Sequence, residues 1–213
     1  MTGRPAGSFG RSVHRPSQAA EDAGAEGNEK LTAMTGLVLL VGFAVEGFTI
    51  LGVQQMLFLH FFVGLVLIGP VVLKIGSTMY RFMRYYTGSA AYVRKGPPAP
   101  VLRVLGPLVI LTSVAVLGTG VVLAVAGPGD GQWLFLHKAS FILWFGVMTI
   151  HVLNYAPRLP RMLAARSGRL AGASGPELLR GSARWLALAG SLAVGIGVAA
   201  LTMTLSAKWG LSL

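Results

Sequence analysis

Hydrophobic side chains are concentrated in five long stretches of the chain, each with few charges and without alternation of polar and apolar positions. About 20 mostly apolar residues suffice for an α-helix to cross the roughly 30 Å hydrocarbon core of a bilayer. A membrane β-barrel would instead show period-two alternation. The pattern therefore predicts an all-α integral membrane protein whose five transmembrane helices lie at about residues 31–52, 56–79, 104–126, 134–155 and 185–206.

The second and fourth predicted helices begin with the same motif. Residues 55–60 read QMLFLH and residues 132–137 read QWLFLH, at an offset of 77 residues. An arginine pair follows each motif: Arg81 and Arg84 in the first copy, Arg158 and Arg161 in the second. We interpret the chain as a duplicated two-helix hairpin, with repeats at about 31–84 and 104–161, that forms a four-helix core about a pseudo-two-fold axis along the membrane normal. The fifth helix has no counterpart and is expected on the outside of this core.

Composition and charge agree with a membrane location. Hydrophobic residues make up 54% of the chain and charged residues only 12%, a balance that a soluble domain could not solvate. The net charge is +11, and 15 of the 18 Lys and Arg residues lie in the tail and in the two long segments between helices. The positive-inside rule predicts that these parts and the N-terminus lie on the cytoplasmic side. The protein itself is expected in the plasma (inner) membrane. The charge is interpreted as a topology determinant that contacts membrane lipid, and no nucleic-acid motif accompanies it.

The predicted organisation has four parts. Residues 1–30 are polar and rich in Gly, Ala and Ser, which predicts a disordered cytoplasmic tail rather than a signal peptide. The four-helix core at 31–155 is followed by a basic cytoplasmic loop at 156–184, whose end from Pro176 to Arg184 is expected to form a short interfacial helix. Residues 185–213 are the fifth transmembrane helix and a short external C-terminus. The chain has no cysteine, which excludes disulfides, iron–sulfur ligation and covalent haem attachment.

Three ionisable residues are predicted at one depth near the outer end of the core. Glu46 and His60 lie seven residues to either side of the first turn, which is centred near Val53, and His137 lies seven residues past Asp130 in the second turn. At a rise of about 1.5 Å per residue, this level is about 10 Å from the turns. Ionisable groups inside a bilayer are costly and mark functional sites by default.

The two histidines at this level suggest a haem b between helices two and four, because symmetry-related helices would present His60 and His137 to one iron from opposite sides. Glu46 could accept the second N–H of a ligating histidine. Three glycines would leave room for the flat porphyrin: Gly64, Gly118 and Gly120. Two alternatives stay open, a structural hydrogen-bonded layer of Glu46, His60 and His137, and a non-haem metal site built from the same residues.

The inner half of the core allows several interpretations. His151 lies 14 residues after His137 and therefore on the same helix face, about 21 Å further along the axis. Its partner in the repeat is Lys74 rather than a histidine. These two residues could mark a second haem, a quinone site in which both donate to a carbonyl oxygen, or purely structural positions.

The pattern of His60, His137 and His151, with its 14-residue spacing, resembles the membrane-bound b-type cytochromes of the bacterial cytochrome b561 and hydrogenase or formate dehydrogenase cytochrome b kind. The resemblance covers residues 31–155. It implies haem b held by histidines of a four-helix core, often as two haems, and electron exchange between quinone and a partner redox protein of an oxidoreductase complex. The chain departs from the two-haem pattern at Lys74. The competing interpretations are a non-redox membrane anchor or assembly subunit and a His/Glu metal-dependent membrane enzyme.

Overall fold

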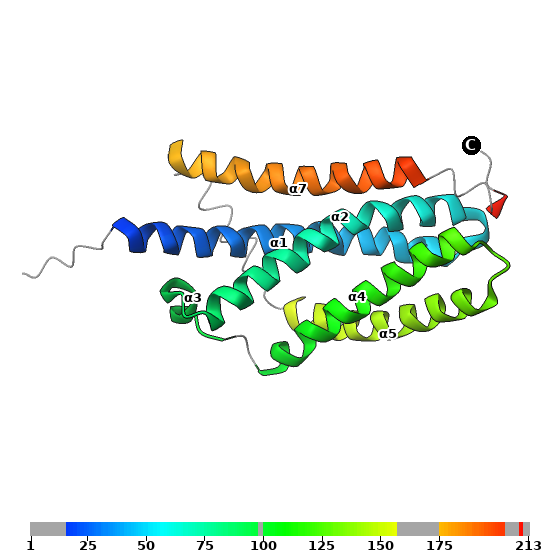
Figure 1. Cartoon of the computed structure of the whole chain (residues 1–213), viewed down its shortest axis with the longest axis horizontal. Helices are drawn as coiled ribbons and strands as arrows, with labels where there is room; N and C mark the ends of the chain where they lie inside the picture. Colours follow the sequence, from blue (N-terminus) through cyan, green and yellow to red (C-terminus); the bar gives the residue numbers. More distant parts are fainter. Residues whose placement is uncertain (1–15, 98–99, 157–174, 203–208, 211–213) are drawn as a thin grey trace, which may run out of the picture.

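The computed structural model describes residues 16–97, 100–156, 175–202 and 209–210. Its helices are α1 (Pro16–Ile50), α2 (Val53–Tyr86), α3 (Ala90–Arg94), α4 (Pro100–Ala126), α5 (Gly131–Tyr155) and α7 (Gly175–Thr202), and the described residues contain no strand (Figure 1). All of these helices except α3 are long and apolar enough to cross a membrane. The predicted all-α bundle with five spanning helices is therefore confirmed.

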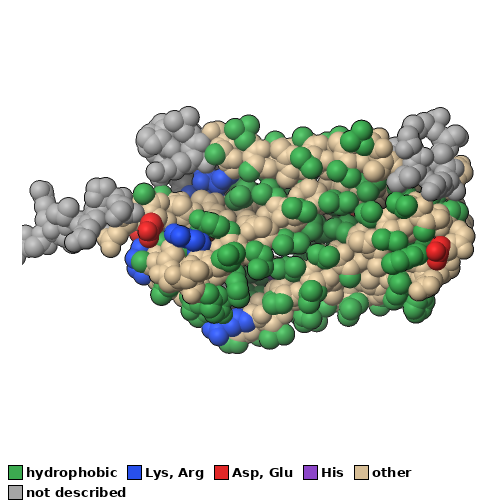
Figure 2. Space-filling model, in the orientation of Figure 1, with side chains coloured by type: hydrophobic (Ala, Val, Ile, Leu, Met, Phe, Trp, Pro, Cys, Tyr) green, Lys and Arg blue, Asp and Glu red, His purple; other side chains and the backbone are tan. Residues whose placement is uncertain are grey.

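The surface of the bundle is apolar along its length and charged at one end. Figure 2 shows hydrophobic side chains over the middle of the visible face and Lys and Arg gathered near α3 and the start of α1. We call this the basic end, and it carries Arg81, Arg84, Arg94, Lys95, Arg103 and Arg184. The opposite end, which we call the turn end, carries the turns at residues 51–52 and 127–130. Exposed apolar side chains over the middle of the bundle suit contact with lipid tails.

The helices form two hairpins and a fifth helix on the far side of α2. Helix α1 packs along α2, and α4 packs along α5. Helix α7 packs as extensively on α2, on the side away from α4 and α5 (Figure 1). A Cβ added at Gly69 would collide with the carbonyl oxygen of Ser191, and one added at Gly195 would collide with that of Val66. Two glycines therefore let the backbones of α2 and α7 touch, as small residues do between membrane helices.

Side chains bridge the two hairpins in the middle of the bundle. Leu39, Leu67 and Val71 form a buried cluster of α1 and α2 that Leu117 of α4 contacts. The ring of Trp144 on α5 lies 4.7 Å from that of Phe43, between centroids, and its Nε1 donates to Ser113 Oγ at 3.0 Å. Within the described part of the chain, α4 is the only helix on which α5 packs extensively. Long side chains rather than close helix packing therefore connect α5 to the first hairpin.

The predicted disordered tail is wrong for residues 16–30, because α1 begins at Pro16. Ala25 of this extension is buried against Ala91 and Tyr92 of α3. The side chains of Arg94 and Lys95 form ion pairs with Asp22 and Glu29, each at 2.5 Å. The alanines and glutamates of this segment favour a helix, and α3 supplies the tertiary contacts that hold it. Residues 1–15 of the predicted tail lie outside the described residues.

Two further boundaries differ from the prediction. Residues 175–184 continue into the fifth spanning helix, so the separate interfacial helix expected from Pro176 to Arg184 is wrong. A proline is tolerated in the first turn of a helix, which lets α7 begin before it. The five-residue α3 was not predicted, and it is flanked by Gly88 and Gly96, whose φ angles of +79° and +74° disfavour other residues. The second arginine pair, at 158 and 161, lies outside the described residues.

Candidate functional site

The imidazole rings of His60 on α2 and His137 on α5 meet between the two hairpins, near the turn end. Their centroids are 6.4 Å apart, and their planes are inclined at 70°. Both residues are half-buried. The structure thus brings together the two histidines that the sequence repeat predicts at one depth.

The start of α2 places His60 close to the end of α1. Met56 has φ −109° and ψ 17°, which are not helical values, so the regular part of α2 begins only one turn before His60. The ring consequently lies level with the last turn of α1. From there it reaches both Glu46 and Thr49.

The hydrogen bonds of His60 assign its tautomer. Thr49 Oγ1 lies 2.6 Å from the carbonyl oxygen of Glu46 and 2.8 Å from His60 Nδ1. A hydroxyl has a single hydrogen, and Thr49 donates it to the carbonyl. Thr49 therefore accepts from Nδ1–H, with Glu46 Oε1 at 3.1 Å as a second acceptor. The lone pair of the neutral ring is then on Nε2.

His137 is held in the same way by the other hairpin. Thr119 Oγ1 donates to the carbonyl oxygen of Ala115 at 2.7 Å and lies 3.2 Å from His137 Nδ1. Thr119 therefore accepts from Nδ1–H, which leaves the lone pair of this ring on Nε2 as well. Ser140 Oγ, 3.0 Å from Thr119 Oγ1, completes the cluster. Two neutral imidazoles with available Nε2 lone pairs can bind a metal centre between them.

The two threonines were missed by sequence reasoning because they do not follow the repeat. Thr49 lies 11 residues before His60, whereas Thr119 lies 18 residues before His137. The turns also differ in length, at residues 51–52 and 127–130. The sequence could have indicated Thr49, because it follows Glu46 by three residues and therefore lies on the same face of the helix.

Glu46 contacts His60, as its predicted depth suggests. Its side chain is 16% exposed and that of His60 21%. Glu46 Oε1 faces Nδ1 of the ring, while Oε2 is enclosed and has no hydrogen-bond partner among the described residues. A Cβ at Gly64 would lie 3.0 Å from Oε1. Gly64 thus makes room for the carboxylate, whereas the sequence suggested that it makes room for a porphyrin.

The two glycines of α4 differ in what they face. A Cβ at Gly120 would lie 3.0 Å from Cε1 of His137, so this glycine lets the imidazole pack against the α4 backbone. A Cβ at Gly118 would have no atom within 4 Å. Of the three glycines that were expected to leave space for a cofactor, Gly64 and Gly120 are occupied by side chains of the site, and Gly118 is exposed on the surface of α4.

The inner level does not repeat the arrangement of the histidine pair. Lys74 Nζ donates to the carbonyl oxygen of Thr32 on α1 at 2.5 Å and lies against Gly36. His151 Nδ1 is enclosed without a hydrogen-bond partner among the described residues, and its ring lies 4.9 Å from that of Tyr155, between centroids. Lys74 and His151 interact electrostatically, but the described part of the chain has no hydrogen bond between them. The side chain of Lys74 is engaged by α1.

Trp209, which follows α7, connects the two hairpins at the turn end. Its Nε1 donates to the carbonyl oxygen of Ala124 on α4 at 3.3 Å, and its ring lies 6.0 Å from that of Phe61 on α2, between centroids. Phe61 is the residue after His60. The indole therefore contacts the residue next to His60 on α2 and the end of α4.

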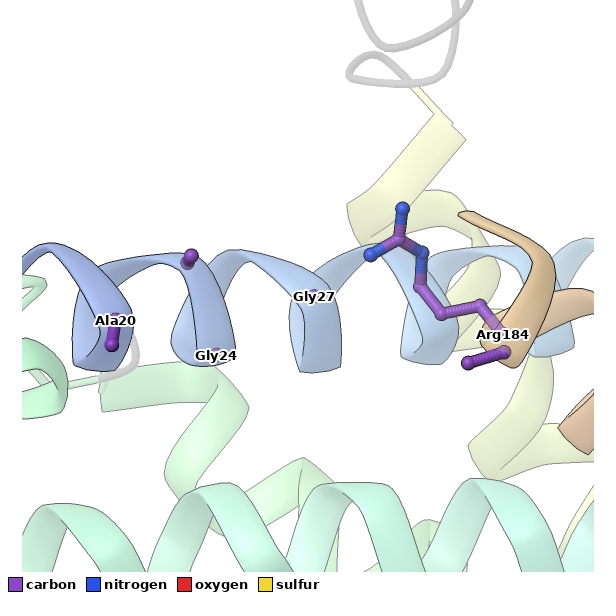
Figure 3. A pocket seen from close by; sticks show the side chains of 6 residues that line it. Ala20, Gly24, Gly27 and Arg184 are labelled. Carbon is purple, nitrogen blue, oxygen red and sulfur yellow. The ribbon is translucent and has the colours of Figure 1, made fainter. Parts of the chain in front are cut away.

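The described chain also has a groove that lies away from the histidine pair. A groove between the start of α1 and α7 lies at the basic end and is lined mainly by alanine and glycine, with Arg184 at its edge (Figure 3). Among the described residues, no three His, Cys, Asp or Glu side chains are placed to hold one metal ion together. Glu46 is directed at Nδ1 of His60, the nitrogen that carries the proton. This orientation disfavours the predicted alternative of a non-haem metal site made by Glu46 and both histidines.

Comparison with known proteins does not identify a relative, since no family model, curated protein or solved structure matches this chain. Its function has to be inferred from the geometry of the histidine pair.

Proposed function

We propose that the protein is a membrane electron-transfer protein, a b-type cytochrome subunit that binds haem b between α2 and α5 through Nε2 of His60 and of His137. The 6.4 Å separation of the two ring centroids carries this proposal. A bond between a metal and an imidazole nitrogen is about 2 Å long, so two rings on opposite sides of one iron have centroids roughly 6 Å apart. The inclination of 70° between the rings is compatible with axial ligation, because each ring can rotate about its own bond to the metal.

The hydrogen bonds around the pair support ligation over a purely structural layer. A ligating histidine usually donates its other N–H to an oxygen acceptor, which sets the ring orientation. Thr49 and Thr119 accept in this way, from opposite sides of the pair, and Glu46 adds a carboxylate on the His60 side. A structural layer would more simply join the two rings directly, yet each ring directs Nδ1–H back to its own hairpin.

The surroundings suit a flat apolar group. Helix α5 is joined to the first hairpin by long side chains such as Trp144 and not by close backbone packing. Trp209 contacts both α2 and α4 at the turn end. A bound haem supplies a centre that takes up and releases one electron. The protein residues hold and orient the two imidazoles and exclude water, and the electron partner is a quinone or a partner redox protein.

One haem is proposed rather than two. The residue that would complete an inner pair with His151 is Lys74, whose Nζ is bonded to the carbonyl oxygen of Thr32. His151 has an enclosed Nδ1 without an acceptor among the described residues. The second candidate role of the inner level is quinone binding, in which a quinone carbonyl oxygen would accept a hydrogen bond from this nitrogen.

The reduced-minus-oxidised spectrum of the purified protein tests the proposal. We expect a sharp α-band after dithionite reduction and about one haem per chain by the pyridine haemochrome assay. A colourless preparation from haem-replete cells would overturn the cytochrome assignment in favour of a membrane anchor or assembly subunit. Stoichiometric zinc or iron without haem would overturn it in favour of a metal-dependent enzyme.

Replacing Thr49 or Thr119 with valine tests the orienting hydrogen bonds. Valine has nearly the same shape as threonine but cannot accept from Nδ1–H, so we expect each change to weaken haem affinity by about 10–100-fold. Thr112→Val is the matched control, because Thr112 is a buried α4 residue that donates to Leu108 of its own helix. Haem titration of the haem-free protein measures the effect. Equal losses in all three variants would show that the threonines act only through helix stability.

A further inference from the structure

Three hydrogen-bond donors are enclosed without an acceptor at the basic end. They are Arg84 Nε, Ser89 Oγ and the hydroxyl of Tyr92, and none has a hydrogen-bond partner among the described residues. Tyr92 is only 5% exposed. An unsatisfied buried donor costs about 1–3 kcal/mol, and native structures contain few of them. Three within nine residues of one another indicate an acceptor that is not among the described residues.

The three donors belong to the turn that joins α2 to α3. The amide of Ser89 donates to the carbonyl oxygen of Arg84 at 3.0 Å, and that of Tyr92 donates to the carbonyl oxygen of Ser89 at 3.0 Å. The guanidinium carbon of Arg84 lies 6.0 Å from the centroid of the Tyr92 ring. The ring of Tyr80, one turn before Arg84, lies 6.1 Å from that of Tyr92, between centroids. Backbone bonds and ring contacts thus place the three residues that carry these donors in one turn.

The charge at this turn is positive. Arg81 and Arg84 both interact electrostatically with the phenol of Tyr92. Two carboxylates of α1 at this end are already paired, Asp22 with Arg94 and Glu29 with Lys95. The missing acceptor is therefore expected to be an anion rather than a further neutral oxygen.

The residues that precede the turn are of the kind expected at the depth of lipid headgroups. The last two turns of α2 carry Tyr80, Phe82 and Tyr86, which are 52%, 53% and 65% exposed. Tyrosine and other aromatic residues gather where a membrane protein passes from hydrocarbon to headgroup. The abundant anionic acceptors at this depth are lipid phosphates.

We propose that the α2–α3 turn is a binding site for the phosphate of an anionic phospholipid, with Arg84, Ser89 and Tyr92 as donors and Arg81 as a second charge. A phosphate offers several acceptor oxygens, and the planar guanidinium of arginine matches it well. Tyr92 is only 5% exposed, and a lipid oxygen would supply the acceptor that its hydroxyl lacks among the described residues. The proposal does not depend on haem binding.

Thermal unfolding in nanodiscs of different lipid tests the site. We expect the wild-type protein to unfold at a higher temperature in phosphatidylglycerol than in phosphatidylcholine, and Tyr92→Phe to lose most of this difference. In phosphatidylcholine, Tyr92→Phe should be as stable as the wild type or more so, because the change removes an unsatisfied hydroxyl. Arg84→Gln should also lose the difference. The control Arg184→Gln removes an arginine at the same end but outside the turn (Figure 3), and it should retain the difference.

Two outcomes would overturn the proposal. If phosphatidylglycerol stabilises Tyr92→Phe as much as the wild type, the hydroxyl does not contact lipid. The difference in unfolding temperature between the two lipids would then come from nonspecific attraction between basic residues and anionic headgroups. If inorganic phosphate added to phosphatidylcholine nanodiscs gives the full stabilisation, the ligand is free phosphate rather than a lipid. Native mass spectrometry gives an independent measurement, in which one phosphatidylglycerol should stay bound to the wild type and be lost from Tyr92→Phe.

Discussion

Replacing His60 or His137 with alanine is expected to abolish haem binding. Each change removes one of the two Nε2 donors, which lie on rings only 6.4 Å apart between centroids. The haem-to-protein ratio after identical purification should fall by at least about ten-fold in either variant, because two-ligand haem sites depend on both axial donors. His151→Ala is the matched control and should retain haem, since its ring lies at the inner level beside Tyr155.

Loss of a ligand can be separated from loss of structure in these variants. His60→Gly and His137→Gly leave space for free imidazole, which should restore the haem spectrum when it is added during reconstitution. A collapsed bundle would not respond to imidazole. If both histidine variants keep haem, or if only His151→Ala loses it, the assignment of the axial ligands is wrong.

Replacing Gly69 with valine is expected to release α7 from α2. Any Cβ at this position collides with the backbone carbonyl of Ser191, which cannot move without shifting the whole helix. We expect the free energy of unfolding to fall by about 1–3 kcal/mol or more, as over-packing of a tight interface does. Gly195→Val should have a similar effect, because its Cβ would collide with the carbonyl of Val66. Thermal unfolding in detergent and protease sensitivity of the α7 segment measure the change.

The repeat supplies the control for this experiment. Gly146 lies 77 residues after Gly69, at the same position of the second hairpin, and a Cβ there would have no atom within 4 Å. Both substitutions change helix propensity equally, so the difference between Gly69→Val and Gly146→Val reports packing alone. Equal destabilisation of the two variants would show that the backbone contact between α2 and α7 does not hold the fifth helix.

The spans and the level of the histidine pair could be predicted from the sequence. Bilayer thickness sets the length of an apolar helix, so five apolar runs were enough to count the helices. The duplicated motif and the short turns placed His60 and His137 at one depth, because the rise per residue of a helix is constant. The number of residues between Glu46 and the first turn predicted that Glu46 lies at the same depth. The structure shows Glu46 in contact with His60.

The direction in which each side chain points from its helix could not be predicted in this way. A helix that is apolar all round gives no pattern from which its rotation about its own axis can be deduced. For this reason the sequence suggested that Gly64 lines a cofactor space, whereas it faces Glu46. For the same reason Lys74 was considered a partner of His151, whereas its amine is bonded to Thr32 on α1.

A membrane bundle of five helices with two histidines at one level follows from the amino-acid sequence, because length, hydrophobicity and repetition are properties of the chain alone. The three-dimensional packing of the helices selects the partners of each ring and so the tautomer that we infer, since Thr49 and Thr119 lie on neighbouring helices and outside the repeat. It also decided that residues 16–30 are helical, because α3 pairs with that segment across more than sixty residues of sequence. Contacts between distant segments depend on how the helices are rotated and tilted, which a uniformly apolar sequence does not specify.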